Sequence, residues 1–324
     1  MIKRDVSIDF LMLLAILLVV NSHMDGVYGE SFNRIATGGL FGDALFFFCS
    51  GYKLFLGKMD GFVNWYRRRV VRIYPTIIVF DLLYALVLSA PLTVGNVFDG
   101  WKVCGYWFVK CIMIHYIFIW LVRRFCEKHL KLVFAGVAAA TLGLWCFAYS
   151  PRFAVEMTCA NWFQWFYMFL FTLGGGCLAA FKKGNDSFSF LGGVILAFGA
   201  MVAHYGLIAV IDRNAWLMPA RVAIIGTCAG VVYGLYMISK SGLISRLMAT
   251  KCGGAIVFLS SLSLEVYISN TIYIDYFANW RRPFNLICCW IVIFAGAYIV
   301  RCLTRFALQI LDVGKEIDFS KVFK

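Results

Sequence analysis

Long apolar runs recur along the whole chain, and this feature restricts the possible folds more than any other. An α-helix needs about 20 mostly apolar residues to cross roughly 30 Å of hydrocarbon, and runs of this kind follow one another from end to end. The composition agrees, because 62% of the 324 residues are hydrophobic and only 15% are charged, against about a quarter charged in a soluble domain. We therefore predict an all-α, polytopic membrane protein that forms a single domain over residues 1–324.

Ten transmembrane helices can be drawn through these runs. They lie near residues 8–23, 38–57, 76–94, 104–122, 132–148, 162–181, 188–206, 216–238, 254–273 and 284–301. Most of the 30 Lys and Arg residues then fall in connections on one side, which is the positive-inside pattern. Both termini are therefore predicted to be cytoplasmic, and the net charge of +13 reflects orientation in the bilayer rather than nucleic-acid binding. The first run has no small-residue cleavage site after it, so it is predicted to be a retained helix.

Two patterns that often mark sites have structural explanations here. Most of the 12 cysteines lie in or beside apolar segments, where thiols behave as small hydrophobic groups, and no CxxC pair or Cys/His spacing indicates a metal site. The run Gly174-Gly175-Gly176 lies within a predicted span and lacks a P-loop lysine. We predict that these glycines allow close helix approach and that the protein has no metal site.

The first apolar run, residues 8–23, carries polar groups on one face. At about 100° per residue, Asp9, Met12 and His23 lie on nearly the same side of the helix, and His23 is at its outer end. Histidine suits general-base catalysis because its ordinary pKa is about 6.5. His23 is therefore a candidate base, and the alternative is an interfacial histidine that hydrogen-bonds a helix end.

Asp43, in the second predicted helix, lies near the outer membrane face at a depth similar to that of His23. A carboxylate there could hold the tautomer of His23, as the acid does in a Ser-His-Asp triad. The alternative is a solvated carboxylate at a helix start, where the helix dipole favours negative charge. Asp25 and Glu30, in the outer loop between the two helices, are rival partners for His23.

A basic and aromatic stretch, residues 60–76, precedes the third predicted helix at the inner membrane surface. Its arginines, Arg67, Arg68, Arg69 and Arg72, suit phosphate groups, because guanidinium groups match phosphate geometry with paired hydrogen bonds. The alternative is that they attract anionic lipid and set the topology. Pro75 is predicted to lie in the first turn of the third helix, where proline is tolerated.

Two ionisable residues lie deep in predicted spans: Lys110 in the fourth and Glu265 in the ninth. A charge near the bilayer centre costs at least about 2.5 kcal/mol on insertion scales, so such groups usually face a protein interior and have partners. We predict that both face a helix-lined cavity, where they could pair with each other as a structural ion pair. Of the other histidines, His115 is predicted to be a packing residue, His129 a loop residue and His204 a secondary site candidate.

Several motifs occur in a recognisable order. An acid in the first helix and His23 at its end are followed by Gly-Asp-x-x-Phe-Phe-x-x-Ser-Gly-Tyr at residues 42–52. Arg69-x-x-Arg72-Ile73-x-Pro75, Trp107-Phe108 and Ser263-x-x-x-Tyr267 come next. Together they resemble the acyltransferase 3 family of integral-membrane O-acyltransferases, which acylate sugars of surface polysaccharides and related envelope glycans. The resemblance is strongest over residues 4–75.

The resemblance implies a reaction and its participants. An acyl-CoA, with acetyl-CoA as the default, would donate from the cytoplasm, and a glycan or glycolipid hydroxyl at the outer face would accept. His23 would be the general base, and Asp43, from its depth rather than from the resemblance, is the candidate for the orienting acid. The setting would be the lipid bilayer of the bacterial inner membrane, and neither a metal nor nucleic acid would take part.

The resemblance also assigns binding residues. Arg69 and Arg72 match the family pattern and, with Arg68, would bind the phosphates of coenzyme A. Four further residues are candidates for the substrate channel: Lys110, Glu265, Asn270 and Trp107. Two positions depart from the family pattern, since Met12 stands where an arginine is usual and Asn270 where a histidine is usual. Lys110 is considered as a replacement for the charge missing at Met12.

Two other functions compete with this interpretation. A transporter or flippase of a lipid-linked glycan would also bury charges along a pathway, but it predicts internal symmetry and correspondingly broken helices, which the sequence does not show. The departures at Met12 and Asn270 fit a catalytically inactive family member that only binds a ligand or partner. The sequence does not address the oligomeric state.

Overall fold

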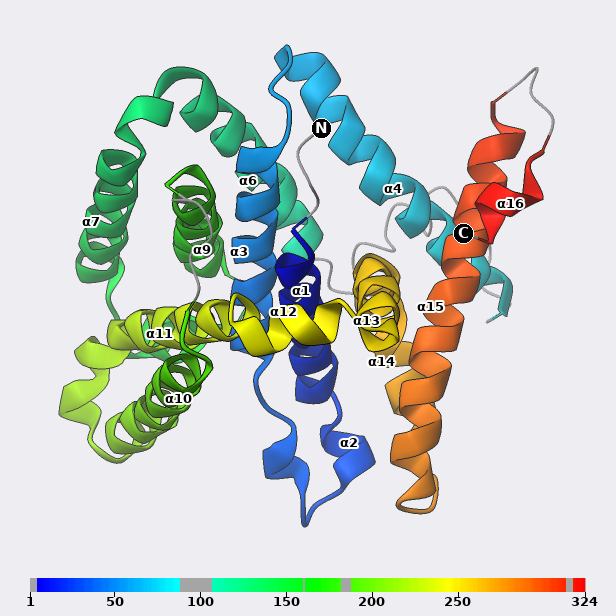
Figure 1. Ribbon diagram of the computed structural model, residues 1–324. Coiled ribbons are helices and arrows are strands. Elements are labelled where there is room, and N and C mark those ends of the chain that lie inside the picture. Colours follow the sequence, from blue (N-terminus) through cyan, green and yellow to red (C-terminus); the bar gives the residue numbers. More distant parts are fainter. Residues whose placement is uncertain (1–4, 88–106, 160, 182–187, 313–316, 324) are drawn as a thin grey trace. The chain divides into compact units, whose positions relative to one another are not determined.

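The computed structural model describes residues 5–87, 107–159, 161–181, 188–312 and 317–323 (Figure 1). Within these ranges the chain is helical, and its only β-type pairing is an isolated bridge between Phe188 and Ser241. The predicted all-α class is therefore confirmed. The eleven cysteines in these ranges are all free thiols.

The helices follow one another with short connections. In order they are α1 (Val6–Ser22), α2 (Asp25–Tyr28), η1 (Asn33–Ile35), α3 (Gly39–Leu56), α4 (Phe62–Val87), α6 (Trp107–Phe125), η2 (Glu127–His129), α7 (Leu130–Ala148), α8 (Pro151–Glu156), α9 (Trp162–Ala180), α10 (Phe190–Arg213), η3 (Ala215–Val222), α11 (Ala223–Ser239), α12 (Gly242–Met248), α13 (Lys251–Ser261), α14 (Ser263–Phe277), α15 (Phe284–Ile310) and α16 (Phe319–Val322).

Six helices in the described part of the chain are long and apolar enough to cross a membrane, or up to seven if a bent pair counts as one span. The six cover Asn33–Leu56, Glu127–Ala148, Trp162–Ala180, Phe190–Arg213, Ala215–Ser239 and Phe284–Ile310, and each coincides with a predicted span. The count of ten is not confirmed. Helix α1 is apolar but has 17 residues, and the predicted spans 76–94 and 104–122 run into residues 88–106, outside the described residues. The orientation of the termini stays a prediction.

The predicted ninth span, residues 254–273, is not one helix. The chain ends α13 at Ser261 and starts α14 at Ser263, and α12 and α13 meet at 87°. Arg301 of α15 explains the break between α13 and α14, because its guanidinium donates to the main-chain carbonyl and to Oγ of Ser261. A carbonyl bound in this way no longer needs the next helical turn as its partner.

Pro75 lies in the interior of α4, so its predicted place in the first turn of a helix is wrong. The arginine-rich stretch before it is itself helical, since arginine is a good helix former, and α4 therefore begins at Phe62. Proline in a helix interior removes the hydrogen bond to the carbonyl four residues earlier, here that of Val71.

The described chain divides into two compact units, each assembled from separate stretches. Unit 1 comprises Met1–Ala15, Leu40–Met59 and Phe108–Val257, and unit 2 comprises Ile16–Gly39, Asp60–Trp107 and Phe258–Lys324. In unit 1, α10 packs along α11 and α7 along α9. In unit 2, α14 packs against α15, α4 and α2. Helix α1 contributes its first part to unit 1 and its last part to unit 2.

Glycines set the closest approach in unit 1, where α3 crosses α9. A Cβ atom at Gly51 would overlap the main-chain oxygen of Thr172, and one at Gly175 would overlap that of Phe48. Gly175 belongs to the glycine run of residues 174–176, so the prediction of close helix approach is confirmed. Glycine is required at both positions because two backbones meet there.

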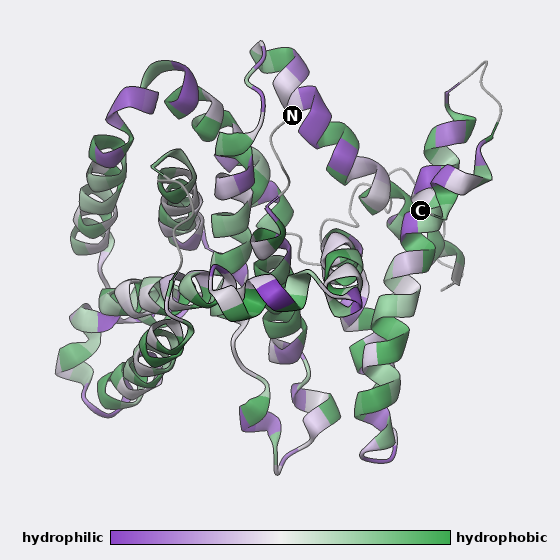
Figure 2. Ribbon diagram, viewed as in Figure 1, coloured by the Kyte–Doolittle hydropathy of each residue, from purple (hydrophilic) through white to green (hydrophobic). Residues whose placement is uncertain are grey.

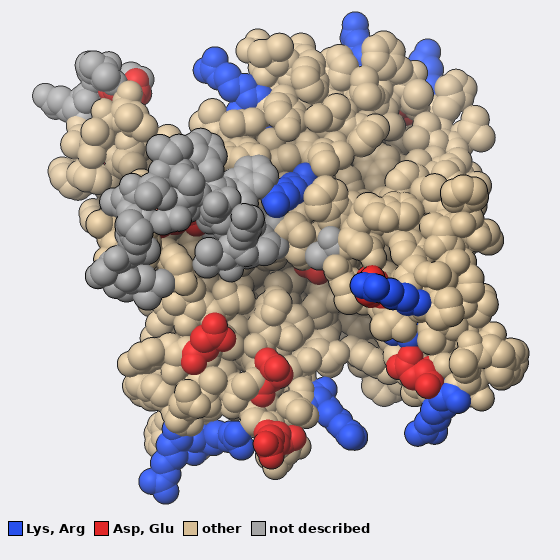
Figure 3. All heavy atoms as spheres, turned by 180° about the vertical axis from the view of Figure 1, so that it is seen from behind, with Lys and Arg blue, Asp and Glu red and all other residues tan. Residues whose placement is uncertain are grey.

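The surface is strongly apolar. Only 11% of the α10 span is buried within the protein, and large side chains such as Ile195 and Phe198 are more than half exposed. Hydrophobic residues dominate α7, α10 and α15 in Figure 2, and hydrophilic residues gather in the first half of α4 and between α6 and α7. Figure 3 likewise shows few charged side chains on a largely uncharged face. Such a surface suits contact with lipid rather than with water.

Candidate functional site

His23 directly follows α1 and belongs to unit 2. Its main-chain N–H donates to the carbonyl of Val20 at 3.1 Å, which closes the turn at the helix end. The imidazole is exposed and forms no hydrogen bond with any residue that the structure describes. The prediction that His23 stands at the end of the first helix is therefore correct, and its ring nitrogens are available to a ligand.

The loop that follows His23 is held by polar side chains of unit 2. Asn21 Nδ2 donates to the carbonyls of Ile35 and Thr37 at 2.8 and 2.9 Å, and the hydroxyl of Tyr28 donates to Asn21 Oδ1 at 2.6 Å. From α15, Asn285 Nδ2 donates to the carbonyl of Val27 at 2.8 Å. The backbone around His23 is thus fixed although its side chain is unpaired.

The surroundings of His23 favour its neutral form. Atoms around the ring partly shield it from water and lower the pKa of His23 below the ordinary histidine value, while the nearby Asp25 acts in the opposite direction. A neutral imidazole at pH 7 has a free nitrogen lone pair, which a general base needs. Of the carboxylates considered as partners of His23, Asp25 is the one whose charge acts on the ring.

Asp43 lies in the second turn of α3 and belongs to unit 1. It is half-buried and forms no hydrogen bond or ion pair with any described residue. The hydroxyl of Tyr167, in α9 of the same unit, is likewise without a hydrogen-bond partner among the described residues, and it is buried. Because Asp43 and His23 belong to different units, their pairing stays a prediction.

The three arginines assigned to coenzyme A lie on α4 in unit 2, in three different states. Arg68 is exposed and paired with Asp60. Arg69 stacks over the ring of the buried Trp65, with its guanidinium carbon 3.8 Å from the ring centroid, and donates to the Trp65 carbonyl at 2.7 Å. Arg72 is exposed and makes no ion pair with a described residue. Arg72 is therefore the most available of the three to an anionic ligand.

The channel candidates are spread over both units. Trp107 and Lys110 lie in the first turn of α6 and are half-buried. Glu265 is buried in the first turn of α14, and its carboxylate accepts two hydrogen bonds from Arg301, at 3.1 and 2.9 Å. Glu265 is thus buried, with Arg301 rather than Lys110 as its ion-pair partner, and its position beside a helix-lined cavity stays a prediction.

Asn270 is buried in α14, and only the nitrogen of its side-chain amide forms hydrogen bonds with described residues. Its Nδ2 donates to the carbonyls of Val266 and Tyr267 at 3.0 and 2.8 Å, which are one turn back in the same helix. Its Oδ1 is buried and has no hydrogen-bond partner among the described residues. An amide oxygen in this state can accept a hydrogen bond from a ligand.

A cluster in unit 1 was missed by the sequence analysis. Nζ of Lys53, in the last turn of α3, lies 3.2 Å from Oδ1 of the buried Asp9 and contacts Sδ of Met12. The cation beside Met12 is therefore Lys53, whereas Lys110 had been considered as the replacement. Antiparallel packing of the first two helices brings the start of one beside the end of the other, and this predicted topology was the signal that could have revealed the pair.

A second ion pair lies at the start of α1 in the same unit. Lys240, which follows α11, pairs with Asp5, and the hydroxyl of Tyr52 donates to Asp5 Oδ2 at 3.0 Å. The hydrogen bonds and charge of Lys240 hold the pKa of Asp5 well below its usual range, against the opposing effect of burial. These contacts tie α1, α3 and the end of α11 together.

The two buried histidines of unit 1 are structural. His115 Nδ1 lies 3.1 Å from Oγ1 of Thr172 and Nε2 lies 2.8 Å from the carbonyl of Trp165, which confirms the predicted packing role. His204, a secondary site candidate, is buried with Nδ1 2.9 Å from Oγ1 of Thr227 and its ring against Phe41.

The comparison with known families decides the class of protein. The family model of the acyltransferase domain, acyltransferase 3, matches residues 5–305. The chain belongs to the acyltransferase 3 family. Comparisons with curated proteins and with solved structures give no match. This acyltransferase 3 protein is thus a membrane acyltransferase, and the match includes every residue assigned above to catalysis or binding.

Proposed function

We propose that the protein transfers an acyl group, acetyl by default, from acyl-CoA to a hydroxyl of a glycan or glycan precursor. The membrane would be the bacterial inner membrane, with the donor bound from the cytoplasm. Family membership supports acyl transfer in a membrane, and the donor and acceptor come from the motifs quoted above. The single observation that carries the mechanism is the state of His23, an exposed imidazole on a fixed turn with no hydrogen-bond partner among the described residues.

His23 would act as the general base. A sugar hydroxyl is a weak nucleophile at neutral pH, so removal of its proton during attack on the thioester lowers the activation barrier. A positioned base raises the rate by a factor of about 10²–10⁴ in this way. The carbonyl carbon of the thioester gains a bond to the hydroxyl oxygen and loses its bond to sulfur, and coenzyme A leaves as the thiol. Asp43 is proposed as the orienting acid, and Asp25, within the same unit as His23, supports the positive charge that forms on the ring.

The arginines of α4 would bind the phosphates of coenzyme A. Arg72 would make the primary contact because it is exposed. Arg69, stacked on Trp65, would present a guanidinium whose orientation is already fixed, and Arg68 would have to exchange Asp60 for phosphate. We expect Arg72→Ala to raise KM for acyl-CoA with kcat almost unchanged, because phosphate binding is shared by the substrate and the transition state.

The experiment uses the purified full chain in lipid vesicles, radiolabelled acetyl-CoA and a set of surface glycans as acceptors. Acceptor-dependent release of coenzyme A together with a labelled glycan supports the proposal. Label that stays on acetyl-CoA with every acceptor, from a protein that binds it, would indicate an inactive family member. Arg67→Ala is the matched control for Arg72→Ala, since Arg67 is exposed on the same helix but lies outside the family motif.

A further inference from the structure

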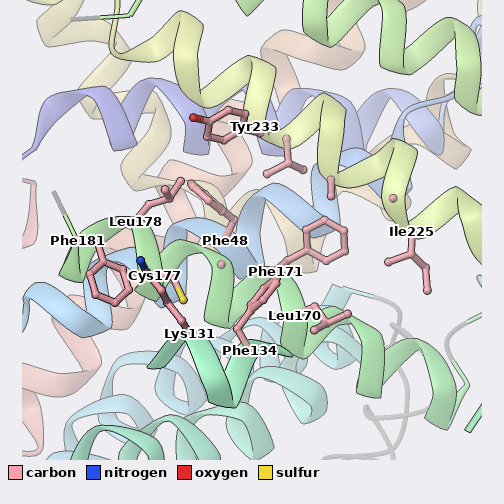
Figure 4. Close-up of a pocket in the computed structure, with 14 residues that line it drawn as sticks. Phe48, Lys131, Phe134, Leu170, Phe171, Cys177, Leu178, Phe181, Ile225 and Tyr233 are labelled. Atoms are coloured by element: carbon pink, nitrogen blue, oxygen red, sulfur yellow. The ribbon is translucent and has the colours of Figure 1, made fainter. Parts of the chain in front are cut away.

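Unit 1 contains an apolar cavity of about 660 Å³ that the proposed reaction does not use. Helices α3, α7, α9 and α11 form its walls, and its lining is almost entirely aromatic and aliphatic. Figure 4 shows Phe48, Phe134 and Phe171 around its middle. The volume lies within the ~300–1,000 Å³ of typical ligand pockets.

The cavity is elongated along α9. Leu170 and Phe181 both line it, and Phe181 is eleven positions after Leu170, which corresponds to about 16 Å at 1.5 Å per residue. Gly226, on α11, also lines it, and a Cβ atom there would have open space around it. The shape therefore suits a flexible hydrocarbon chain better than a compact ring system.

One end of the cavity carries a positive charge, that of Lys131. Among the residues that the structure describes, Lys131 is the only charged one in the lining, and its Nζ lies 4.9 Å from the centroid of the Phe181 ring (Figure 4). Lys131 is the second residue of α7 and Phe181 directly follows α9, so this end lies at the level of helix termini. In a membrane protein, helix termini lie near the lipid head groups.

We propose that this cavity binds one chain of an anionic phospholipid, with the phosphate of the head group at Lys131. The lining supplies the hydrocarbon contacts, and Lys131 supplies charge complementarity at the level where head groups lie. None of the described residues in the lining is acidic. The site is independent of the proposed acyl transfer.

The test uses the full chain purified in detergent and incubated with an equal mixture of phosphatidylglycerol and phosphatidylcholine with identical chains. Native mass spectrometry counts the lipids that remain bound. We expect phosphatidylglycerol to exceed phosphatidylcholine about fivefold, the factor that corresponds to about 1 kcal/mol per basic residue near an anionic surface. Lys131→Ala should abolish this preference, and Lys128→Ala, an exposed lysine three residues away that does not line the cavity, should keep it.

A second pair of variants tests the cavity itself. Gly226→Leu fills it and should reduce the amount of both lipids retained severalfold, whereas Gly206→Leu, at an equally open helix position away from the lining, should not. If Gly226→Leu does not give folded protein, Ala229→Phe fills the same space. A preference that survives Lys131→Ala, or lipid retention that survives filling of the cavity, would overturn the proposal.

Discussion

The imidazoles of His115 and His23 differ in burial and in hydrogen bonding. Around His115, in unit 1, both ring nitrogens have partners within 3.1 Å and the ring is buried between α6 and α9. Around His23, in unit 2, the backbone is fixed by neighbouring hydrogen bonds, but the imidazole itself is exposed and unpaired within the described chain.

This difference indicates which polar residues of an apolar helical protein are structural and which are candidates for catalysis. A buried polar group without a partner is costly, so structural polar groups are paired. A ring on a fixed backbone with free nitrogens contributes little to stability and is available for proton transfer. Removing a paired group should therefore cost stability, and removing His23 should cost catalysis.

The largest effect on stability is expected at the Arg301–Glu265 pair, which extends the comparison into unit 2. Arg301→Met leaves a buried carboxylate without its cation, which costs about 3–5 kcal/mol in soluble proteins. Thermal unfolding in detergent should show a strongly lowered midpoint. The double variant Arg301→Met/Glu265→Leu should recover most of the lost stability. Normal stability with lost activity in the single variant would place the pair in catalysis and would contradict the structural role of paired groups.

His115→Ala should lower the free energy of unfolding by about 2–4 kcal/mol, because it leaves a cavity and removes the hydrogen bonds of the ring with Thr172 and Trp165. Acyl transfer per folded molecule should stay near that of the wild type. The measurement is a denaturation curve together with the initial rate, normalised to the folded fraction. A stable but inactive His115→Ala protein would contradict the structural role.

Gly51→Ala should cost about 1–3 kcal/mol, because the added methyl group overlaps the main-chain oxygen of Thr172 and pushes α3 from α9. Gly136→Ala is the control, since nothing lies within 4 Å of a Cβ atom there and alanine is the better helix former by up to about 1 kcal/mol. Equal unfolding midpoints for the two variants would show that α3 and α9 do not meet as closely as described.

The smallest effect concerns pH. If neutral His23 is the base, the rate falls as pH drops through its pKa, which lies below the ordinary histidine value. Asp25 raises that pKa, so Asp25→Asn should lower it further and move the acid limb of the kcat/KM profile to lower pH. Glu30→Gln should leave the limb in place. A limb that moves to higher pH would contradict the assignment.

The sequence was sufficient for features that depend on local pattern. Runs of apolar residues predicted the six spans found among the described helices, and the glycines of 174–176 predicted close packing. Features set by partners from distant helices were missed. Hydropathy does not show that Arg301 interrupts the helix at Ser261, or that Lys53 lies against Met12. Each of these contacts joins residues far apart in sequence.

The candidate site was predicted in its identity more than in its contacts. His23 at the end of the first helix follows from spacing and motif, as does the group of arginines on α4. The packing of α4 decides that Arg69 is stacked on Trp65 while Arg72 is exposed. This helix begins thirteen residues before Pro75 rather than at Pro75. A helix start is set by the arginine-rich stretch and its tertiary contacts, and proline alone did not reveal it.

The most direct measurement compares His23→Gln with His115→Gln in one assay. Both proteins are assayed for acceptor-dependent release of coenzyme A at equal amounts of folded protein, as judged by gel filtration and circular dichroism. We predict that His115→Gln exceeds His23→Gln in specific activity by about 100-fold or more, the minimum expected for loss of a general base. Equal specific activities in the two variants would contradict the assignment of His23 as the base.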